Sequence, residues 1–249
     1  MTNYFYTLLD SFGSFILFSL RVVKGVFERL FDWDRVFDEM YRLGVQTLPV
    51  ACLTLLFVGM AFTFQIIQEF IKFGATKLIG GVVILAIVRE LSPLLLGVVA
   101  SGRIAASIAA ELGSMSVTDQ MDALKLLGKN PVSFLVPPKL VGVALMLPLL
   151  VCLCHFLGFL GGFLIVFSSN RINPFSYFQS AQVMLSFHDI FSSLIKVFCF
   201  AIVIVLVSSY FGLACKEGAA SVGKNTTRAV VVSLVCVFIL NYFLSNLLF

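Results

Sequence analysis

The sequence predicts an all-α integral membrane protein, with an N-terminal interfacial amphipathic helix followed by five transmembrane helices. Of its 249 residues, 60% are hydrophobic and only 12% are charged, whereas about 25% of the residues of a soluble domain are charged. The mean hydropathy is +1.05. Several uncharged runs exceed the roughly 18 residues that indicate a spanning helix, and none shows the alternation of a membrane β-barrel.

The six cysteines lie in or at the edge of apolar runs, without a C-x-x-C pair, and the chain has only two histidines. A zinc site therefore has almost no supply of ligands. We expect the cysteines to be buried as small apolar side chains; they are Cys52, Cys152, Cys154, Cys199, Cys215 and Cys236. The net charge of +4 is modest, and it bears on membrane orientation rather than on nucleic acid.

Residues 1–46 are expected to form the interfacial segment. Between residues 21 and 32 the apolar and charged residues fall on opposite helical faces, as in a helix that lies in the plane of a membrane surface. The apolar face holds Val22, Val23, Val26, Phe27 and Leu30, and the charged face holds Arg21, Lys24, Glu28 and Asp32. An additional span over residues 5–20 is the alternative, although Asp10 and Arg21 bracket only ten uncharged residues. The basic residues follow the apolar part, which is the wrong order for a signal peptide.

The first two spans are predicted over residues 43–68 and 78–102. The first contains no charged residue over 26 positions, and a helix rises about 1.5 Å per residue, so it is long enough to cross a bilayer. The second is interrupted by Arg89, Glu90 and Pro93. Two interpretations remain open, and they do not exclude each other: the charges neutralise each other at a kink or short re-entrant turn, and they line a transport path.

A polar stretch follows the second span. The small-residue run AASIAA at 105–110 allows close helix packing, and Glu111-Leu-Gly113 is expected to break the helix. Ser116 and Asp119 form a weak variant of a capping box.

An amphipathic helix is predicted over residues 117–127, ended by Gly128 and Pro131. Its apolar side holds Val117, Met121, Leu124 and Leu127. It is too short to span, and is either a solvated linker or a docking element for a soluble partner.

Three further spans are predicted over residues 139–171, 190–215 and 229–249. The first of them contains Gly158, Gly161 and Gly162, which favour close helix packing, and His155, which we expect to be a hydrogen-bonded packing residue. A turn at Asn173-Pro174 follows, and KEGAASVGKNTTR at 216–228 is expected to be a hydrophilic loop.

The basic residues predict the orientation. If the N-terminus is cytoplasmic, five spans place 12 of the 17 basic residues inside and the C-terminus outside, which satisfies the positive-inside rule. The inner residues are Arg21, Lys24, Arg29, Arg35, Arg42, Arg103, Lys125, Lys129, Lys139, Lys216, Lys224 and Arg228. The others are Lys72, Lys77, Arg89, Arg171 and Lys196. The helix at 117–127 is then cytoplasmic.

The segment from Gly218 to Asn225 nearly fits the phosphate-binding pattern G-x-x-x-x-G-K-[ST]. Asn225 stands where the magnesium-binding hydroxyl is needed, and no predicted strand precedes the segment. Nucleotide chemistry is therefore expected in a partner chain.

The stretch RELSPLLLGVVASGRIAASIAAELGSMSVTDQMDAL at 89–124, with Asn130-Pro131, resembles the signature of the MlaE (YrbE) family of ABC transporter permeases. The resemblance continues at LGVQTLPVACLTLLFVGMAFTFQ and in GKNTTRAVVVSLVCVFILNYFLSNLLF, so it covers most of residues 40–249. Ser92 stands for the family's Gly, Asp119 for Glu and Asn130 for Asp. The last change removes a charge and puts in doubt any salt bridge that the family makes there.

The resemblance implies a single permease domain over 1–249, with residues 1–46 interfacial and 47–249 forming the bundle. Two copies would pair in the membrane and rest on two cytoplasmic ABC ATPase subunits, which bind the ATP and Mg, so no cofactor is expected in this chain. Family members move phospholipids or related lipids between membranes with an MCE-domain lipid-binding protein, and a small cytoplasmic regulatory subunit is a further candidate partner. The implied membrane is a bacterial inner membrane or a plastid inner envelope.

The resemblance also implies two sets of site residues and no catalytic or metal-binding residue. Arg89, Glu90 and Pro93 would lie along the lipid path. Coupling to the ATPase would involve a cytoplasmic coupling helix with Arg103, Glu111, Gly113, Met115, Thr118, Asp119, Gln120 and Asp122. The alternatives are a secondary transporter, in which Arg89 and Glu90 relay protons or couple an ion, and a non-transporting membrane anchor.

Overall fold

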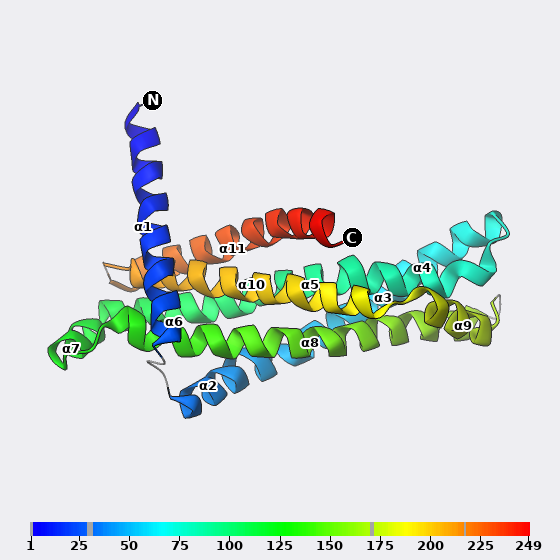
Figure 1. Ribbon diagram of the computed structural model, residues 1–249, viewed down its shortest axis with the longest axis horizontal. Helices are drawn as coiled ribbons and strands as arrows, with labels where there is room; N and C mark the ends of the chain where they lie inside the picture. Colours follow the sequence, from blue (N-terminus) through cyan, green and yellow to red (C-terminus); the bar gives the residue numbers. More distant parts are fainter. Residues whose placement is uncertain (1, 29–31, 170–171, 217) are drawn as a thin grey trace. The chain divides into compact units, whose positions relative to one another are not determined.

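The computed structural model describes residues 2–28, 32–169, 172–216 and 218–249, with side chains from Gly13 onward. Every element in these residues is helical (Figure 1). The α-helices are α1 (Thr2–Phe27), α2 (Trp33–Glu39), α3 (Leu48–Lys72), α4 (Ile79–Ala86), α5 (Ser92–Ala100), α6 (Ala106–Val117), α7 (Gln120–Leu126), α8 (Pro131–Ser169), α9 (Pro174–Met184), α10 (Phe187–Leu213) and α11 (Gly218–Leu248). Short π or 3-10 turns are η1 (Met40–Gly44), η2 (Val45–Thr47), η3 (Thr76–Leu78), η4 (Ile87–Leu91) and η5 (Ser101–Ala105).

Five helical stretches are long and apolar enough to cross a membrane, which confirms the predicted fold class. Within the described residues they are Trp33–Lys72, Thr76–Val117, Pro131–Ser169, Phe187–Leu213 and Gly218–Leu248. The turns η1 and η2 join α2 to α3, and η4 and η5 join α4, α5 and α6 into one 42-residue stretch. The chain is therefore an integral membrane protein.

The contacts divide the chain into two compact units. The described part of unit 1 lies within Met1–Val45, Ser101–Ala144 and Ala201–Leu234. Unit 2 comprises Gln46–Ala100, Leu145–Phe200 and Val235–Phe249.

The helices extend beyond the uncharged runs that predicted them. Residues 33–47 continue directly into α3, and α8 begins at Pro131 rather than near Lys139. The expected hydrophilic loop at 216–228 is wrong from Gly218 onward, where α11 begins. Polarity marks a segment as solvated but does not prevent helix formation, since helical backbone groups bond within the segment itself. Asn173 does mark the expected turn: its side chain accepts a hydrogen bond from the Phe175 N–H at 2.9 Å and caps α9.

Helix α1 presents three different faces. Phe18 and Val22 are buried in unit 1, and the rings of Phe15 and Phe18 lie edge-on to Tyr210, with centroids 5.5 and 5.7 Å away. Leu20 and Phe27 are exposed on a second, apolar face, while the charged residues occupy a third. The interfacial placement of this segment stays a prediction. Leu30 and Arg29 of the expected helix, and Arg171 of the orientation argument, lie outside the described residues.

Glycines of α8 bring it into backbone contact with α3 in unit 2, as the sequence predicts. A methyl group built on Gly161 would overlap the carbonyl oxygen of Leu56, and one built on Gly59 would overlap the carbonyl of Gly158. Small residues let membrane helices approach this closely. The two helices are therefore packed by the shape of their backbones.

Replacing Gly59 by alanine is expected to destabilise the protein by about 1–3 kcal/mol, because the added methyl meets rigid backbone rather than a mobile side chain. Thermal unfolding of the detergent-solubilised protein measures the loss. Gly102→Ala is the matched control, since nothing lies within 4 Å of its added methyl group. Equal stability of the two variants would contradict the close α3–α8 packing.

Small residues have the same role in unit 1. Gly212 of α10 packs on α6, where an added methyl would lie 3.0 Å from the carbonyl oxygen of Ala109. The expected break at Gly113 is wrong, because α6 continues to Val117. An added methyl on Gly113 would lie 3.0 Å from Cys215 Sγ, so this glycine permits close packing instead of ending the helix.

The cysteines form no disulfide among the described residues. Cys154 and Cys215 are buried as expected. The expectation is wrong for Cys152, which is exposed on α8 beside the exposed Leu153. The remaining three are partly buried.

Candidate functional site

The interruption of the second span is a π turn within a continuous helix. Pro93 has no N–H to donate to the carbonyl four residues earlier, which is that of Arg89. The Lys196 ammonium of α10 donates to this carbonyl at 2.8 Å. A backbone acceptor freed inside a membrane helix is thus bonded by a neighbouring helix, which lowers the cost of placing proline there.

Lys196 also joins Glu90 to the last helix. Its ammonium donates to Glu90 Oε1 at 2.9 Å and to Ser245 Oγ at 2.7 Å. Glu90 further accepts from Asn241 Nδ2 at 2.9 Å and from Ser245 at 2.7 Å. An ammonium has three N–H groups, and each has an acceptor here.

Arg89 pairs with a different residue of α10. Its guanidinium donates from Nε to Asp189 Oδ1 at 2.9 Å, and a second nitrogen lies 2.8 Å from the same oxygen. The other oxygen of Asp189 accepts from the backbone N–H and the hydroxyl of Ser186, at 3.0 and 2.9 Å. The expectation that Arg89 and Glu90 neutralise each other, at a kink or a short re-entrant turn, is therefore wrong as to their partners. Each has a counter-ion of its own on α10.

We call Arg89, Glu90, Asp189, Lys196, Asn241 and Ser245 the unit 2 cluster. Its anchoring charges are buried, with the side chains of Lys196 and Asp189 exposed by 0% and 2%. The two charged residues of the π turn are more open: the Arg89 and Glu90 side chains are 40% and 42% exposed. The Phe249 ring lies beside both cations, 4.8 Å from Arg89 and 4.9 Å from Lys196. The cluster thus presents one cation and one anion beside apolar surface.

Sequence reasoning identified only part of this cluster. The sequence does not single out Asp189, Asn241 and Ser245, and it marks Lys196 only as one of the basic residues outside the cytoplasmic set. The available signal was the position of polar residues in apolar spans, since such groups usually face a partner or a cavity.

A second charged group, the unit 1 cluster, comprises Glu39, Arg42, Glu111 and Lys139. Lys139 is 1% exposed, and its ammonium donates to the Glu111 oxygens at 2.9 and 2.8 Å and to Glu39. Arg42 bonds Glu39 at 3.0 Å and also bonds Glu111. The two cations balance the two carboxylates. Glu111, predicted as a coupling residue, links α6 to Lys139 of α8 and to Arg42 in the turn after α2. Sequence spacing gave no sign of these long-range pairs.

The predicted amphipathic helix is shorter than expected. Helix α6 runs to Val117, and α7 covers seven residues after a left-handed turn at Asp119, whose φ is 56°. The capping box is wrong, because Asp119 makes no side-chain cap and Ser116 donates to the Cys215 carbonyl at 2.7 Å instead. Gly128 ends α7 with φ of 73°, as predicted, whereas Pro131 begins α8.

The surface of α7 is open. Met121 is buried, whereas Leu126 and Leu127 at the end of the helix are 89% and 74% exposed. Asp122 pairs with Lys125 at 2.7 Å on the solvent side. A short helix with an apolar tip and exposed charges suits contact with another protein.

The other predicted coupling residues are dispersed over unit 1. Arg103 is exposed in η5, and Met115 is half-buried on α6. Thr118 and Gln120 are exposed at the turn before α7, where the Thr118 hydroxyl donates to the Ser114 carbonyl at 2.9 Å. Thr118, Asp119, Gln120 and Asp122 therefore lie together around the start of α7. Glu111 and Gly113 lie earlier, on α6, where they contact other segments of unit 1.

No group of three or more His, Cys, Asp or Glu side chains within the described residues could hold a metal ion. The segment from Gly218 to Asn225 forms the first turns of α11, so its backbone is not a phosphate-binding loop.

Comparisons with known proteins agree on one family. The family described as Permease MlaE matches residues 36–247. The chain is 43% identical to a probable ABC transporter permease protein of Synechocystis over 92% of its own length and 86% of the relative's. It is 35% identical to a probable ABC transporter permease protein of Rickettsia typhi, over 96% of its own length and 93% of the relative's. It is also 38% identical to the chloroplastic protein TRIGALACTOSYLDIACYLGLYCEROL 1 of Arabidopsis thaliana, covering 92% of its own length but 65% of that protein.

Proposed function

This chain belongs to the MlaE family of permeases, as a permease subunit of an ABC transporter, and on that premise we propose that it moves phospholipid or a related lipid between membranes. The permease subunit is a non-catalytic transport subunit, and it works with an ATPase. In our proposal, ATP binding and hydrolysis, with Mg, take place entirely in that partner.

The observation that carries the lipid proposal is the unit 2 cluster. A transported phospholipid needs apolar surface for its acyl chains and a polar contact for its head group. Arg89 is held by the buried Asp189 yet keeps 40% of its side chain exposed, so its guanidinium can contact a phosphate without leaving its counter-ion. Glu90, fixed by Lys196, offers an acceptor for head-group donors at the next position along the helix.

The exposed surface of the last helix supports pairing with a second copy of the chain. In the most apolar 18-residue stretch of α11, only 11% is buried within the chain. Phe238, Tyr242, Phe243 and Leu247 of this helix are 53–79% exposed, and Phe243 and Leu247 lie four residues apart on one face. Such a surface packs against lipid or against another membrane helix. A second copy there would enclose the open side chains of Glu90 and Arg89.

Helix α7 is the proposed docking element for the cytoplasmic ATPase. If the five helical stretches cross the membrane in turn, α7, the N-terminus and the turn before α11 share one side, and the positive-inside rule favours the cytoplasm for that side. Leu126 and Leu127 would enter a groove of the ATPase, while Asp119 and Asp122 would bias the contact toward one partner. The C-terminus then lies on the outer side.

The remaining partners follow from the family. We propose an MCE-domain lipid-binding protein on the outer side of the membrane and a small regulatory subunit on the cytoplasmic side. The membrane would be a bacterial inner membrane or a plastid inner envelope; the Arabidopsis relative is chloroplastic.

Mass spectrometry of lipids that co-purify with the complex, with and without ATP, tests the substrate. We expect phospholipid to be enriched without ATP and reduced with it, and Arg89→Gln to lower the share of anionic species. Lys77→Gln, a charge change elsewhere in unit 2, is the control. An unaltered lipid content in Arg89→Gln would count against the cluster as the head-group contact.

Charge reversal at Asp119 and Asp122 is expected to abolish co-purification with the ATPase. Because Asp119 has a left-handed backbone, which is costly for lysine, D119N/D122K is the better variant: asparagine tolerates that conformation. Glu69→Lys is the matched control, since Glu69, in the last turn of α3, is exposed to a similar degree. A retained complex with full lipid-stimulated ATP hydrolysis would exclude α7 as the docking element.

A further inference from the structure

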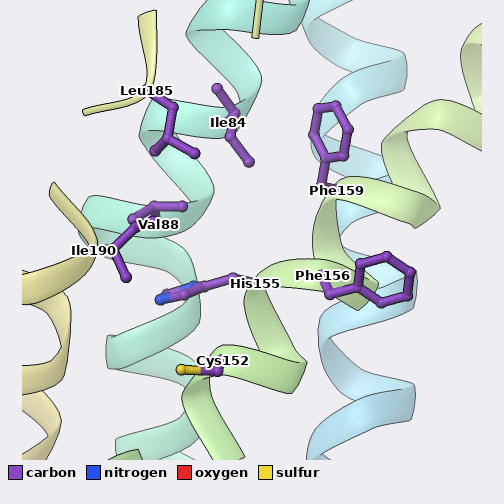
Figure 2. Close-up of a pocket in the computed structure, with 8 residues that line it drawn as sticks. All are labelled: Ile84, Val88, Cys152, His155, Phe156, Phe159, Leu185 and Ile190. Atoms are coloured by element: carbon purple, nitrogen blue, oxygen red, sulfur yellow. The ribbon is translucent and has the colours of Figure 1, made fainter. Parts of the chain in front are cut away.

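A pocket of about 350 Å³ lies in unit 2 on the side of α8 that carries His155 (Figure 2). Its lining comes from α4, η4, α8, α10 and the connection before α10. The lining residues are Ile84, Val88, Cys152, His155, Phe156, Phe159, Leu185 and Ile190. This volume is within the range of pockets that hold small molecules, which are mostly apolar with a few polar groups.

His155 is the polar group of this pocket. It is 8% exposed, and its Nε2 lies 3.1 Å from Ser193 Oγ, which confirms the expected hydrogen bond. Its other ring nitrogen, Nδ1, is buried and has no hydrogen-bond partner among the described residues. Figure 2 shows the ring projecting from α8 toward Val88 and Ile190. A buried polar atom without a partner is costly in an apolar region, so Nδ1 marks a position where a ligand atom would be stabilised.

The geometry restricts the ligand's chemistry. If Ser193 donates to Nε2, Nδ1 carries the proton and donates; if Nε2 donates, Nδ1 accepts. A hydroxyl can serve either tautomer, because it both donates and accepts. None of the eight lining side chains is charged, so a phosphate or carboxylate would lack a counter-ion.

The surroundings indicate a lipid rather than a water-soluble molecule. Lys139 is the only charged residue of α8, and the helix has no charge from there to Ser169. Phe156 and Cys152 are exposed at the pocket, on a span whose outer surface faces hydrocarbon. A ligand can therefore enter from the bilayer.

We propose that this pocket binds the hydroxyl end of a neutral membrane lipid, such as a diacylglycerol, with the hydroxyl on His155 Nδ1 and the hydrocarbon against Phe159 and Ile190. The site is distinct from the unit 2 cluster, whose charged side chains do not line it. The proposal rests on the chain being a membrane protein and not on the transported substrate.

Photolabelling of the full chain in phosphatidylcholine nanodiscs tests the site. The probe is a diacylglycerol with a diazirine in one acyl chain, and peptide mass spectrometry locates the adduct. We expect labelling within residues 152–159. The deoxy analogue, which lacks only the hydroxyl, is expected to label roughly five- to tenfold less, as a lost hydrogen bond implies.

Variants and a second readout separate binding from folding. His155→Leu should lower labelling to the level of the deoxy probe, His155→Gln should retain part of it, and His188→Leu, which changes the chain's other histidine, should leave it unchanged. Bound diacylglycerol should also protect the Cys152 thiol from N-ethylmaleimide in the unmodified chain. Equal labelling by the two probes on the unmodified chain, adducts elsewhere, or equal labelling by a phosphatidylcholine diazirine would each overturn the proposal. If His155→Leu does not fold, the comparison of probes on the unmodified chain decides it.

Discussion

Replacing Glu90 by alanine is expected to destabilise the protein by about 3–5 kcal/mol, because it leaves a buried charge without its counter-ion. The Lys196 side chain is 0% exposed, and Glu90 is the only carboxylate paired with it among the described residues. The Ser245 hydroxyl and the Arg89 carbonyl would remain as neutral acceptors, which do not offset the desolvation of an ammonium. Thermal or denaturant unfolding in detergent measures this loss.

A double variant separates stability from transport. Glu90→Met with Lys196→Met removes both charges and is expected to recover part of the lost stability, since replacing a buried ion pair by apolar residues is often neutral, although the Arg89 carbonyl loses its donor. The recovered protein should still move lipid poorly, because the open carboxylate is gone. If the single and double variants are equally destabilised, the Glu90–Lys196 pair does not carry the stability assigned to it.

Replacing Lys139 by methionine is expected to have an effect of similar size, about 3–5 kcal/mol. Glu111 and Glu39 would share Arg42 as their remaining partner, with 29% and 15% of their side chains exposed. Two carboxylates around one guanidinium leave an uncompensated negative charge inside unit 1. The same unfolding measurement applies, and Glu111→Gln added to Lys139→Met should recover part of the loss by restoring the balance.

Lys125→Met provides the control for this prediction. Lys125 forms an ion pair with Asp122, but both side chains are more than 60% exposed, and exposed pairs contribute about 0–1 kcal/mol. Lys139→Met should therefore be several times more damaging. Similar losses in the two variants would mean that the unit 1 cluster is solvated and contributes little.

The sequence predicts the spans well because each depends on a local property, an uncharged run of sufficient length. It predicts their ends poorly for the same reason. The polar segment at 216–228 is predicted to be a loop, yet α11 begins at Gly218, because a helix forms in water as long as its backbone bonds are made. Gly113 likewise stands inside a helix, where a close neighbour requires a residue without a side chain.

The candidate site divides in a similar way. Arg89, Glu90 and Pro93 stand out locally as polar or helix-breaking residues in an apolar span. Their partners do not, because Asp189 lies 100 positions and Ser245 155 positions further along the chain. Arg89 and Glu90 pair with residues of α10 rather than with each other because of the way α10 and α11 pack. The spacing of residues within one helix gives no information about that packing.

Lipid movement and ATP hydrolysis measured in the same vesicles test the central claim most directly. The purified chain alone should hydrolyse no ATP and move no lipid, with or without an ion gradient. Vesicles that also contain the ATPase should move lipid when ATP is added, and D119N/D122K should remove that movement. Lipid movement by the chain alone under an ion gradient would contradict the account, and so would ATP-driven movement that does not depend on α7.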